Sequence, residues 1–134
     1  MAVRYLLDTN TCSYIIKGTF PRVRERLRQI PLPEIGISAV TEAELRFGVA
    51  RLADPSRIEI AVEEFLRHVE ILPWGSDEAH HYAHIRADLE RRGAPMGNLD
   101  MVIAAQALAA EAVLVTSDRV FRRVKGLKVE DWSK

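Results

Sequence analysis

The amino-acid sequence predicts an α/β protein in which residues 1–134 form a single domain. We expect a short, mostly parallel sheet of four to five strands with helices on both faces. Three observations support this fold class: short apolar, β-branched runs recur along the chain, segments with helical spacing separate them, and no internal repeat or linker interrupts the pattern. Strands that alternate with helices favour βαβ units, in which successive strands run parallel.

The first half of the chain supplies two of the expected strands. Val3–Leu7 is apolar and stops at a polar turn that begins with Asp8, and Ile35–Ile37 is a second short apolar run. Three helices are expected in this half: Thr11–Lys17, Pro21–Arg28, and a helix whose N-cap is Ser38. The prolines before Ile35 predict an extended connection.

The second half repeats the alternation of helices and strands. The expected helical segments are Ile58–Arg67, a helix capped by Ser76 that ends near Arg92, Leu99–Ala110, and a short turn over Val120–Val124. The expected strands are Val69–Leu72, Val113–Thr116 and Leu127–Val129. In an open parallel sheet of this kind, ligands bind beyond the carboxyl ends of the strands, near the point where the strand order reverses.

Charge and composition exclude several classes of protein. Lys and Arg together number 19, as do Asp and Glu, so the chain lacks the strong positive charge of a protein that coats nucleic acid. Any contact with nucleic acid must come from a local patch. The hydrophobic fraction of 48% and the charged fraction of 28% are those of an ordinary globular protein.

The only cysteine, Cys12, excludes an internal disulfide and a cysteine-based zinc cluster. This usage is typical of a reducing compartment, and we expect a cytoplasmic protein. Charged residues interrupt the N-terminal segment at Arg4 and Asp8, and the apolar run from Met101 to Val115 contains Glu111. We therefore expect neither a secretion signal nor a membrane span.

Four acidic residues follow strands or begin helices in the predicted fold. They are Asp8 after the first strand, Glu44 on the helix after the second, Asp100 at the start of the alanine-rich helix, and Asp118 after the fourth strand. An isolated acid at a strand end is often only a turn or cap residue, so the argument depends on all four converging. Clustered carboxylates without Cys or His favour a hard cation, here Mg²⁺ or Mn²⁺. Such a centre suits phosphoryl chemistry.

The same acids lie in four segments that resemble the successive motifs of PIN-domain nucleases. The segments are Leu6–Asn10, Ser38–Leu45, Met96–Ala104 and Val115–Asp118, and Gly126–Trp132 is similar to the family's C-terminus. Each motif alone is weak, but their order and spacing also match. Within this superfamily the chain most closely resembles the VapC toxins of type II toxin–antitoxin (VapBC) systems.

The resemblance implies roles for individual residues. Asp8 and Asp100 are implied as direct metal ligands, and Glu44 and Asp118 as acids that complete the pocket directly or through water. Glu44 is preferred to Glu42 because it takes the Ala-Glu-Leu position of the motif and lies on the helix face with Thr41 and Leu45. Candidates for hydrogen bonds that orient the acids are Thr9, Asn10, Thr116 and Ser117.

One departure from the family pattern concerns the fourth motif. Many relatives have an additional acidic or amide residue before the following Phe, whereas Arg119 and Val120 separate Asp118 from Phe121 here. Asp118 is therefore the one of the four acids whose motif departs from the family pattern. Expected phosphate contacts near the acids are Arg46, Arg119 and Arg122.

The function implied by the resemblance is that of an endoribonuclease toxin. Water activated by Mg²⁺ or Mn²⁺ would cleave an RNA phosphodiester, leaving a 5′-phosphate and a 3′-hydroxyl. Transfer RNA is the commonest substrate class among relatives. The implied partners are a cognate VapB-type antitoxin, which would cover the acidic pocket, and a second copy of the chain in a homodimer.

Two other functions remain open at this point. One is a catalytically inactive PIN-like module that only binds its antitoxin or RNA. The other is an aspartyl phosphotransferase with Asp8 as nucleophile, although that chemistry favours an acid two residues later, where this chain has Asn10. The histidines His80, His81 and His84 are interpreted as surface residues of a packed helix rather than as a zinc site.

Overall fold

The computed structural model describes residues 2–134 and contains one five-stranded sheet with the order β3-β2-β1-β4-β5. Every neighbouring pair of strands is parallel. The strands are β1 (Tyr5–Leu7), β2 (Ile35–Ser38), β3 (Glu70–Leu72), β4 (Val113–Val115) and β5 (Val129–Glu130). The predicted short parallel sheet of four to five strands is therefore confirmed.

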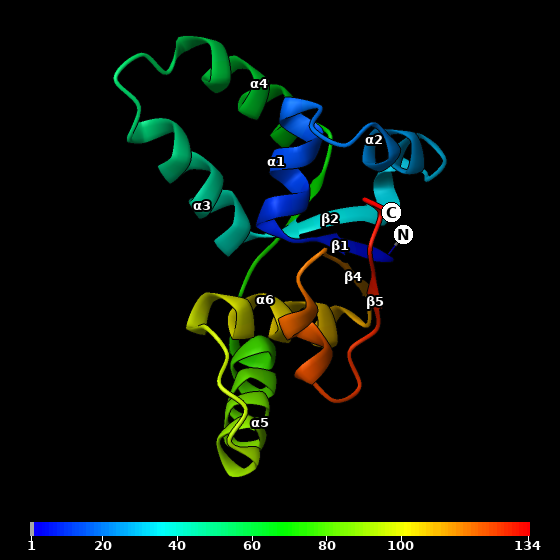
Figure 1. Cartoon of the computed structure of the whole chain (residues 1–134), viewed down its shortest axis with the longest axis vertical. Coiled ribbons are helices and arrows are strands. Elements are labelled where there is room, and N and C mark those ends of the chain that lie inside the picture. Colours follow the sequence, from blue (N-terminus) through cyan, green and yellow to red (C-terminus); the bar gives the residue numbers. More distant parts are fainter. Residues whose placement is uncertain (1) are drawn as a thin grey trace.

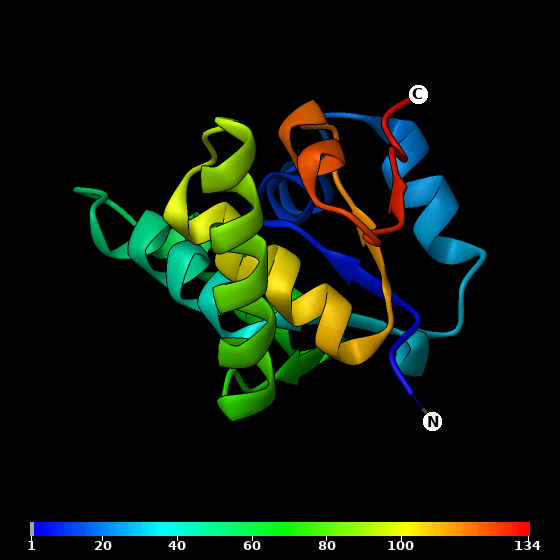
Figure 2. The same cartoon turned by 90° about the horizontal axis from the view of Figure 1, so that it is seen from below.

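Helices cover both faces of this sheet, as predicted (Figure 1). On one face lie α1 (Thr9–Lys17), α2 (Pro21–Arg28), α3 (Ala39–Ala50) and α4 (Ser56–Arg67). On the other lie α5 (Ser76–Arg92) and α6 (Asn98–Ala110), which cross each other in the second view (Figure 2). Short 3₁₀ helices precede β2 and follow β4: η1 (Leu32–Glu34) and η2 (Arg119–Arg123).

Alternating side chains along the central strands build a hydrophobic layer on each face. In β1, Leu7 joins the core beneath α1–α4 and Leu6 joins the core beneath α5 and α6, and both side chains are fully buried. In β4, Val115 and Leu114 divide between the two layers in the same way. Each buried leucine contributes about 1.5–3 kcal/mol relative to an exposed one.

The starts of three helices test the predicted caps. Ser38 is the N-cap of α3, as predicted, and its hydroxyl accepts a 3.1 Å hydrogen bond from the Val40 N–H. The cap predicted at Ser76 is wrong by one residue, because Gly75 is the N-cap of α5 and Glu78 accepts a 2.7 Å hydrogen bond from its N–H. Helix α1 begins at Thr9, two residues earlier than predicted, because the preceding aspartate caps it.

The strand order places β1 between β2 and β4, at the centre of the sheet. The chain leaves β1 for β2 on one side and leaves β4 for β5 on the other, so the strand order reverses between β1 and β4. In sheets of this class, ligands bind beyond the carboxyl ends of the strands at such a point. The segments that follow β1 and β4 carry Asp8 and Asp118. In residues 2–134, no helix combines the length and apolar character needed to cross a membrane.

Candidate metal centre beyond the central strands

Asp8 is a buried carboxylate at the junction between β1 and α1. Its side chain is only 4% exposed, and its Oδ1 accepts a 2.8 Å hydrogen bond from the Thr11 N–H. Asp8 is thus the N-cap of α1, a role in which Asp, Asn, Ser and Thr serve about equally well. Capping alone does not require a buried carboxylate, so the burial of Asp8 calls for a second explanation.

Hydrogen bonds join the end of β1 to the end of β4. The Asp8 N–H and the Thr11 hydroxyl both donate to the Val115 carbonyl at 3.1 Å. The Thr116 hydroxyl donates to Asp8 Oδ2 at 2.6 Å and accepts a 3.0 Å hydrogen bond from the Asp118 N–H. Thr116 therefore connects two of the predicted acidic residues through one buried hydroxyl.

Glu44 projects from α3, where a threonine of α1 orients its side chain. The Thr9 hydroxyl donates to Glu44 Oε1 at 2.6 Å, and the Thr41 Oγ1 lies 3.4 Å from the Thr9 Oγ1. The neighbouring acid on the same helix has a different partner: Glu42 accepts a 2.9 Å hydrogen bond from Arg46. The two glutamates therefore have different environments.

Asp100 and Asp118 occupy more open positions than Asp8. Asp100 lies in the first turn of α6 and is partly buried. Asp118 is exposed, and its Oδ1 accepts a 3.0 Å hydrogen bond from the Val120 N–H, which caps η2. Oδ1 of Asp118 is therefore already engaged by a backbone hydrogen bond.

Burial and mutual repulsion raise the pKa values of two of these acids. Burial is the main cause of the raised pKa of Asp8, hydrogen bonds from Thr116 and Thr11 oppose it, and the negative charge of Asp118 adds to it. Burial also raises the pKa of Asp100, and the negative charges of Asp118, Asp8 and Glu44 raise it further. Asp100 thus lies within electrostatic range of all three other acids.

Among residues 2–134, these four carboxylates have no cationic side chain as partner. The ion pairs found among residues 2–134 all involve other acids, and none joins Lys, Arg or His to Asp8, Glu44, Asp100 or Asp118. Uncompensated negative charge at a partly buried site is unfavourable unless an external cation balances it. The arrangement is thus suited to binding a cation.

The donor set fits a hard dication with a large water shell. Within residues 2–134, no group of three or more Asp, Glu, His or Cys side chains is placed so that together they could hold a metal ion. Mg²⁺ does not need such a group, because it keeps several waters and takes only one or two protein carboxylates directly. Zn²⁺ in a structural site, by contrast, takes four protein ligands of Cys and His type.

Two other residues, Ser117 and Asn10, were also predicted to orient the acids through hydrogen bonds. Ser117 is exposed, and its hydroxyl lies 3.3 Å from the Tyr14 hydroxyl. Asn10 is exposed in the first turn of α1. Sequence reasoning missed Thr11 and Thr41, because their hydroxyls act across the fold and no local motif marks them.

The arginines expected near the acids also differ. Arg46 is held by Glu42 and by Glu63 on α4, so both its charge and its donors are engaged. Arg119 and Arg122 lie exposed on η2, directly after Asp118. Cys12 is fully buried, and burial raises the pKa of its thiol well above the usual value, so the thiol stays protonated.

Comparison with known proteins identifies close relatives over nearly the full chain. The family model of the PIN domain matches residues 5–127. The tRNA(fMet)-specific endonuclease VapC of Salmonella typhimurium is 37% identical over 131 residues, covering 97% of this chain and 98% of the relative. Ribonuclease VapC2 of Rickettsia felis is 33% identical over 132 residues, with 97% and 98% covered.

Solved structures agree with this result. DNA-bound VapBC from Salmonella typhimurium contains a chain that superimposes with a TM-score of 0.91 at 37% identity, covering 97% of this chain and 98% of that one. VapBC2 from Rickettsia felis, bound to a promoter DNA fragment, gives a TM-score of 0.89 at 31% identity, with 97% and 99% covered. VapC ribonucleases are among the relatives of this chain. The fold, the extent of the match and the sequence identity together show that the chain belongs to the PIN-domain family.

Proposed function

We propose that this chain is a VapC-type endoribonuclease that uses Mg²⁺ or Mn²⁺ to cleave RNA. The observation that carries the proposal is Asp8, a buried carboxylate with three further acids nearby and no cationic partner among residues 2–134. Nucleases of the PIN family generally depend on a divalent metal. The curated relatives named ribonucleases and endonucleases support the same activity.

The proposed ligands divide by burial. Asp8 and Asp100 are the proposed direct ligands, since burial disfavours their charged forms most. Glu44 and Asp118 are proposed to act through water. A dication bound there would lower the pKa of a coordinated water and stabilise negative charge on the scissile phosphate.

Three threonines are proposed to hold the acids for this task. Thr116 and Thr9 donate hydrogen bonds of 2.6 Å to Asp8 and Glu44, and Thr11 donates its N–H to the second oxygen of Asp8. Donors to a carboxylate fix its orientation and favour its ionised form. The ordered backbone of β1 and β4 then keeps these donors in place.

Transfer RNA is the proposed substrate class. The support is the printed name of the Salmonella relative, a tRNA(fMet)-specific endonuclease. Arg119 and Arg122 are proposed to contact RNA phosphates, because they are exposed directly after Asp118. Arg46 is a weaker candidate, since two glutamates engage it.

A VapB-type antitoxin is the proposed protein partner, supported by similar chains solved as VapBC complexes. A groove beside Glu44 has exposed apolar walls, in which Phe47 is 67% exposed and Leu99 51% exposed. We propose that an antitoxin segment lies in this groove and brings a basic side chain to the acids. A homodimer and a cytoplasmic location complete the proposal.

The direct test is cleavage of total RNA by the purified chain in the presence of Mn²⁺. We expect wild-type protein to cut and the Asp8→Asn/Asp100→Asn double variant to be inactive. The matched control is Glu42→Gln, which changes an acid that pairs with Arg46 and should leave cleavage intact. Equal cleavage by wild type and the double variant would eliminate the proposed centre, and a binding-only module would neither cleave RNA nor bind Mn²⁺.

A further inference from the structure

We propose that His80 and His84, two exposed residues of α5, form a second metal site for a borderline transition-metal dication such as Zn²⁺, Ni²⁺ or Cu²⁺. This site is separate from the carboxylate centre and independent of the proposed nuclease activity. Both histidines are exposed, and they are four residues apart on a 17-residue helix. Residues at this spacing lie one above the other on a helix face, with Cβ atoms about 5–6 Å apart.

The distance between the two imidazole rings fits shared binding of one ion. The ring centres of His80 and His84 lie 4.7 Å apart, with an angle of 69° between the planes. With metal–nitrogen bonds of about 2.0–2.1 Å and nitrogen–metal–nitrogen angles of about 90–110°, two bound imidazoles would have ring centres about 4.5–5.2 Å apart. The rings are therefore already at chelating separation.

The rest of α5 holds this pair on a rigid support. The inner face of α5 carries Ile85 and Leu89, both buried against α6 in the hydrophobic core. A packed helix loses little conformational freedom when two of its exposed side chains bind an ion, so the ordering cost is confined mainly to the imidazole rings. This geometry favours chelation over binding by a single histidine.

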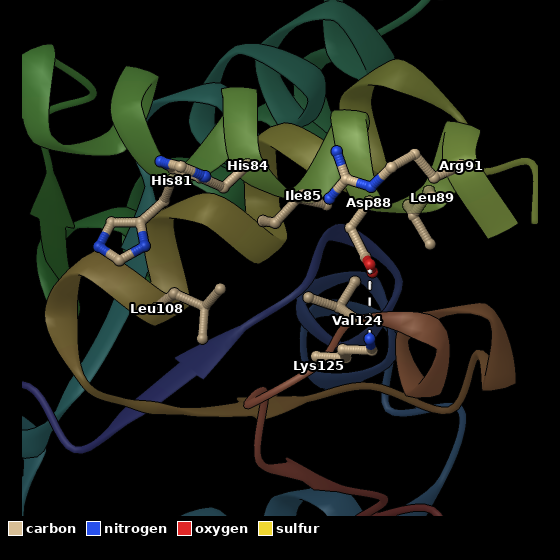
Figure 3. Close-up of a pocket in the computed structure, with 9 residues that line it drawn as sticks. All are labelled: His81, His84, Ile85, Asp88, Leu89, Arg91, Leu108, Val124 and Lys125. Atoms are coloured by element: carbon tan, nitrogen blue, oxygen red, sulfur yellow. Dashed lines mark ion pairs between the residues drawn. The ribbon is translucent and has the colours of Figure 1, made fainter.

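The third histidine of the segment has a different position. The ring centre of His81 lies 6.4 Å from that of His80, which requires the two nitrogens to lie on opposite sides of an ion. His81 and His84 both line a cavity with Leu108 and Val124, between α5, α6 and the segment after η2, so the distance between the rings and not this cavity distinguishes His81 (Figure 3). His81 is therefore excluded from the shell and serves as a control.

The nearest acid one turn further along is also excluded. Asp88 follows His84 by four residues, but it accepts a 2.6 Å hydrogen bond from Arg92. Its carboxylate also lies 3.5 Å from the Lys125 Nζ, an ion pair that Figure 3 shows. These cations lower the pKa of Asp88 and engage its oxygens. The proposed shell thus consists of two imidazole nitrogens, with water in the other positions.

The chemistry of the ligands separates this site from the carboxylate centre. Neutral imidazole suits Zn²⁺, Ni²⁺ and Cu²⁺, whereas oxygen ligands suit Mg²⁺ and Mn²⁺. Excess Mg²⁺ should therefore occupy the acids without competing for the histidines. This difference allows the two sites to be titrated independently in one protein.

The test is calorimetric titration of Zn²⁺ into the untagged full chain in excess Mg²⁺. We expect wild type and His81→Ala to bind one equivalent, and His80→Ala and His84→Ala to bind at least tenfold more weakly. The Asp8→Asn/Asp100→Asn variant should bind Zn²⁺ as wild type does. The proposal fails if wild type takes up no Zn²⁺, if His81→Ala weakens binding as much as the other two, or if the aspartate variant loses it.

A second measurement tests whether the histidine variants fold as the wild type does. Circular dichroism should show the same helix content in all the histidine variants, since the replaced side chains are on the surface or edge of α5. Zn²⁺ should raise the melting temperature of wild type and His81→Ala, because an ion that binds only the folded helix stabilises it. An equal rise in His80→Ala would contradict the proposed chelate.

Discussion

The Thr116 hydroxyl donates a 2.6 Å hydrogen bond to Asp8 Oδ2, although the two residues are 108 positions apart in the sequence. This bond crosses the junction of β1 and β4 at the centre of the sheet. It delivers a donor to a buried carboxylate whose pKa is raised mainly by burial. The Thr116 side chain thus links the proposed metal ligand directly to the segment that follows β4.

Removing this hydroxyl should weaken both the fold and metal binding. Thr116→Val keeps the shape but deprives Asp8 and the Asp118 N–H of a partner. We expect a loss of about 2 kcal/mol in the free energy of unfolding, measured by urea denaturation, and a roughly tenfold loss of Mn²⁺ affinity. Thr116→Ser should restore most of both, and failure of this rescue would contradict the assigned role of the hydroxyl.

Neutralising Asp8 should stabilise the metal-free protein while it abolishes activity. Asn keeps the N-cap of α1 and removes a buried charge that pairs with no Lys, Arg or His among residues 2–134. We expect Asp8→Asn to raise the free energy of unfolding in EDTA by about 0.5–2 kcal/mol, because residues kept for activity often reduce the stability of the fold. A destabilised variant in EDTA would mean that the charge of Asp8 is already compensated within the fold.

The stability difference between Asp8→Asn and wild type should depend on pH. Because folding raises the pKa of Asp8 above the ordinary value of 3.8, the native state binds this proton more tightly than the unfolded chain does. The ionised Asp8 therefore lowers the free energy of unfolding by its full amount above the native-state pKa, and this destabilisation disappears as the pH falls towards 3.8. Paired urea titrations in EDTA should show the variant's advantage shrinking as the pH falls; an advantage that grows would have the wrong sign.

The two glutamates of α3 offer a matched comparison. Glu44 accepts a hydrogen bond from Thr9 beside the acids, whereas Glu42 pairs with Arg46. Glu44→Gln should lower Mn²⁺ affinity about tenfold in calorimetry, and Glu42→Gln should leave it unchanged. Equal effects of the two substitutions would show that general negative charge, rather than position, governs binding.

Asp118 should tolerate substitution better than Asp100. Asp118 is exposed, and Asn in its place can still accept the Val120 N–H that caps η2. We expect Asp118→Asn to reduce the rate of RNA cleavage about ten- to a hundredfold, and Asp100→Asn to reduce it by more. Single-turnover cleavage rates at saturating Mn²⁺ decide the order, and the reverse order would make Asp118 a direct ligand.

Much of the fold follows from local pattern. The apolar runs before Asp8 and around Ile37 predict buried strands, and the strand–helix alternation predicts a parallel sheet. Periodicity does not reveal which strands become neighbours, so the position of β1 between β2 and β4 required the structure. An extended connection was expected before β2, but Leu32–Glu34 forms the short helix η1. A hydrogen bond from the Glu34 N–H to the Pro31 carbonyl closes this turn, and the spacing of the prolines does not predict it.

The acids of the site were predictable because each follows a strand or begins a helix. The threonines around the acids were only partly predictable. Thr9 and Thr116 lie near motif acids in the sequence, whereas the Thr11 hydroxyl donates to the Val115 carbonyl, 104 positions away. A hydroxyl that bonds across the fold leaves no periodic trace in the sequence. Ser117 was also a candidate by adjacency, yet its contact is with Tyr14.

The most direct test of the central claim is an anomalous difference map from a crystal of this chain soaked in Mn²⁺. The account predicts a peak within about 2.0–2.3 Å of oxygens from Asp8 and Asp100, with Glu44 and Asp118 reached through water. A well-ordered crystal without a peak among these oxygens would contradict it.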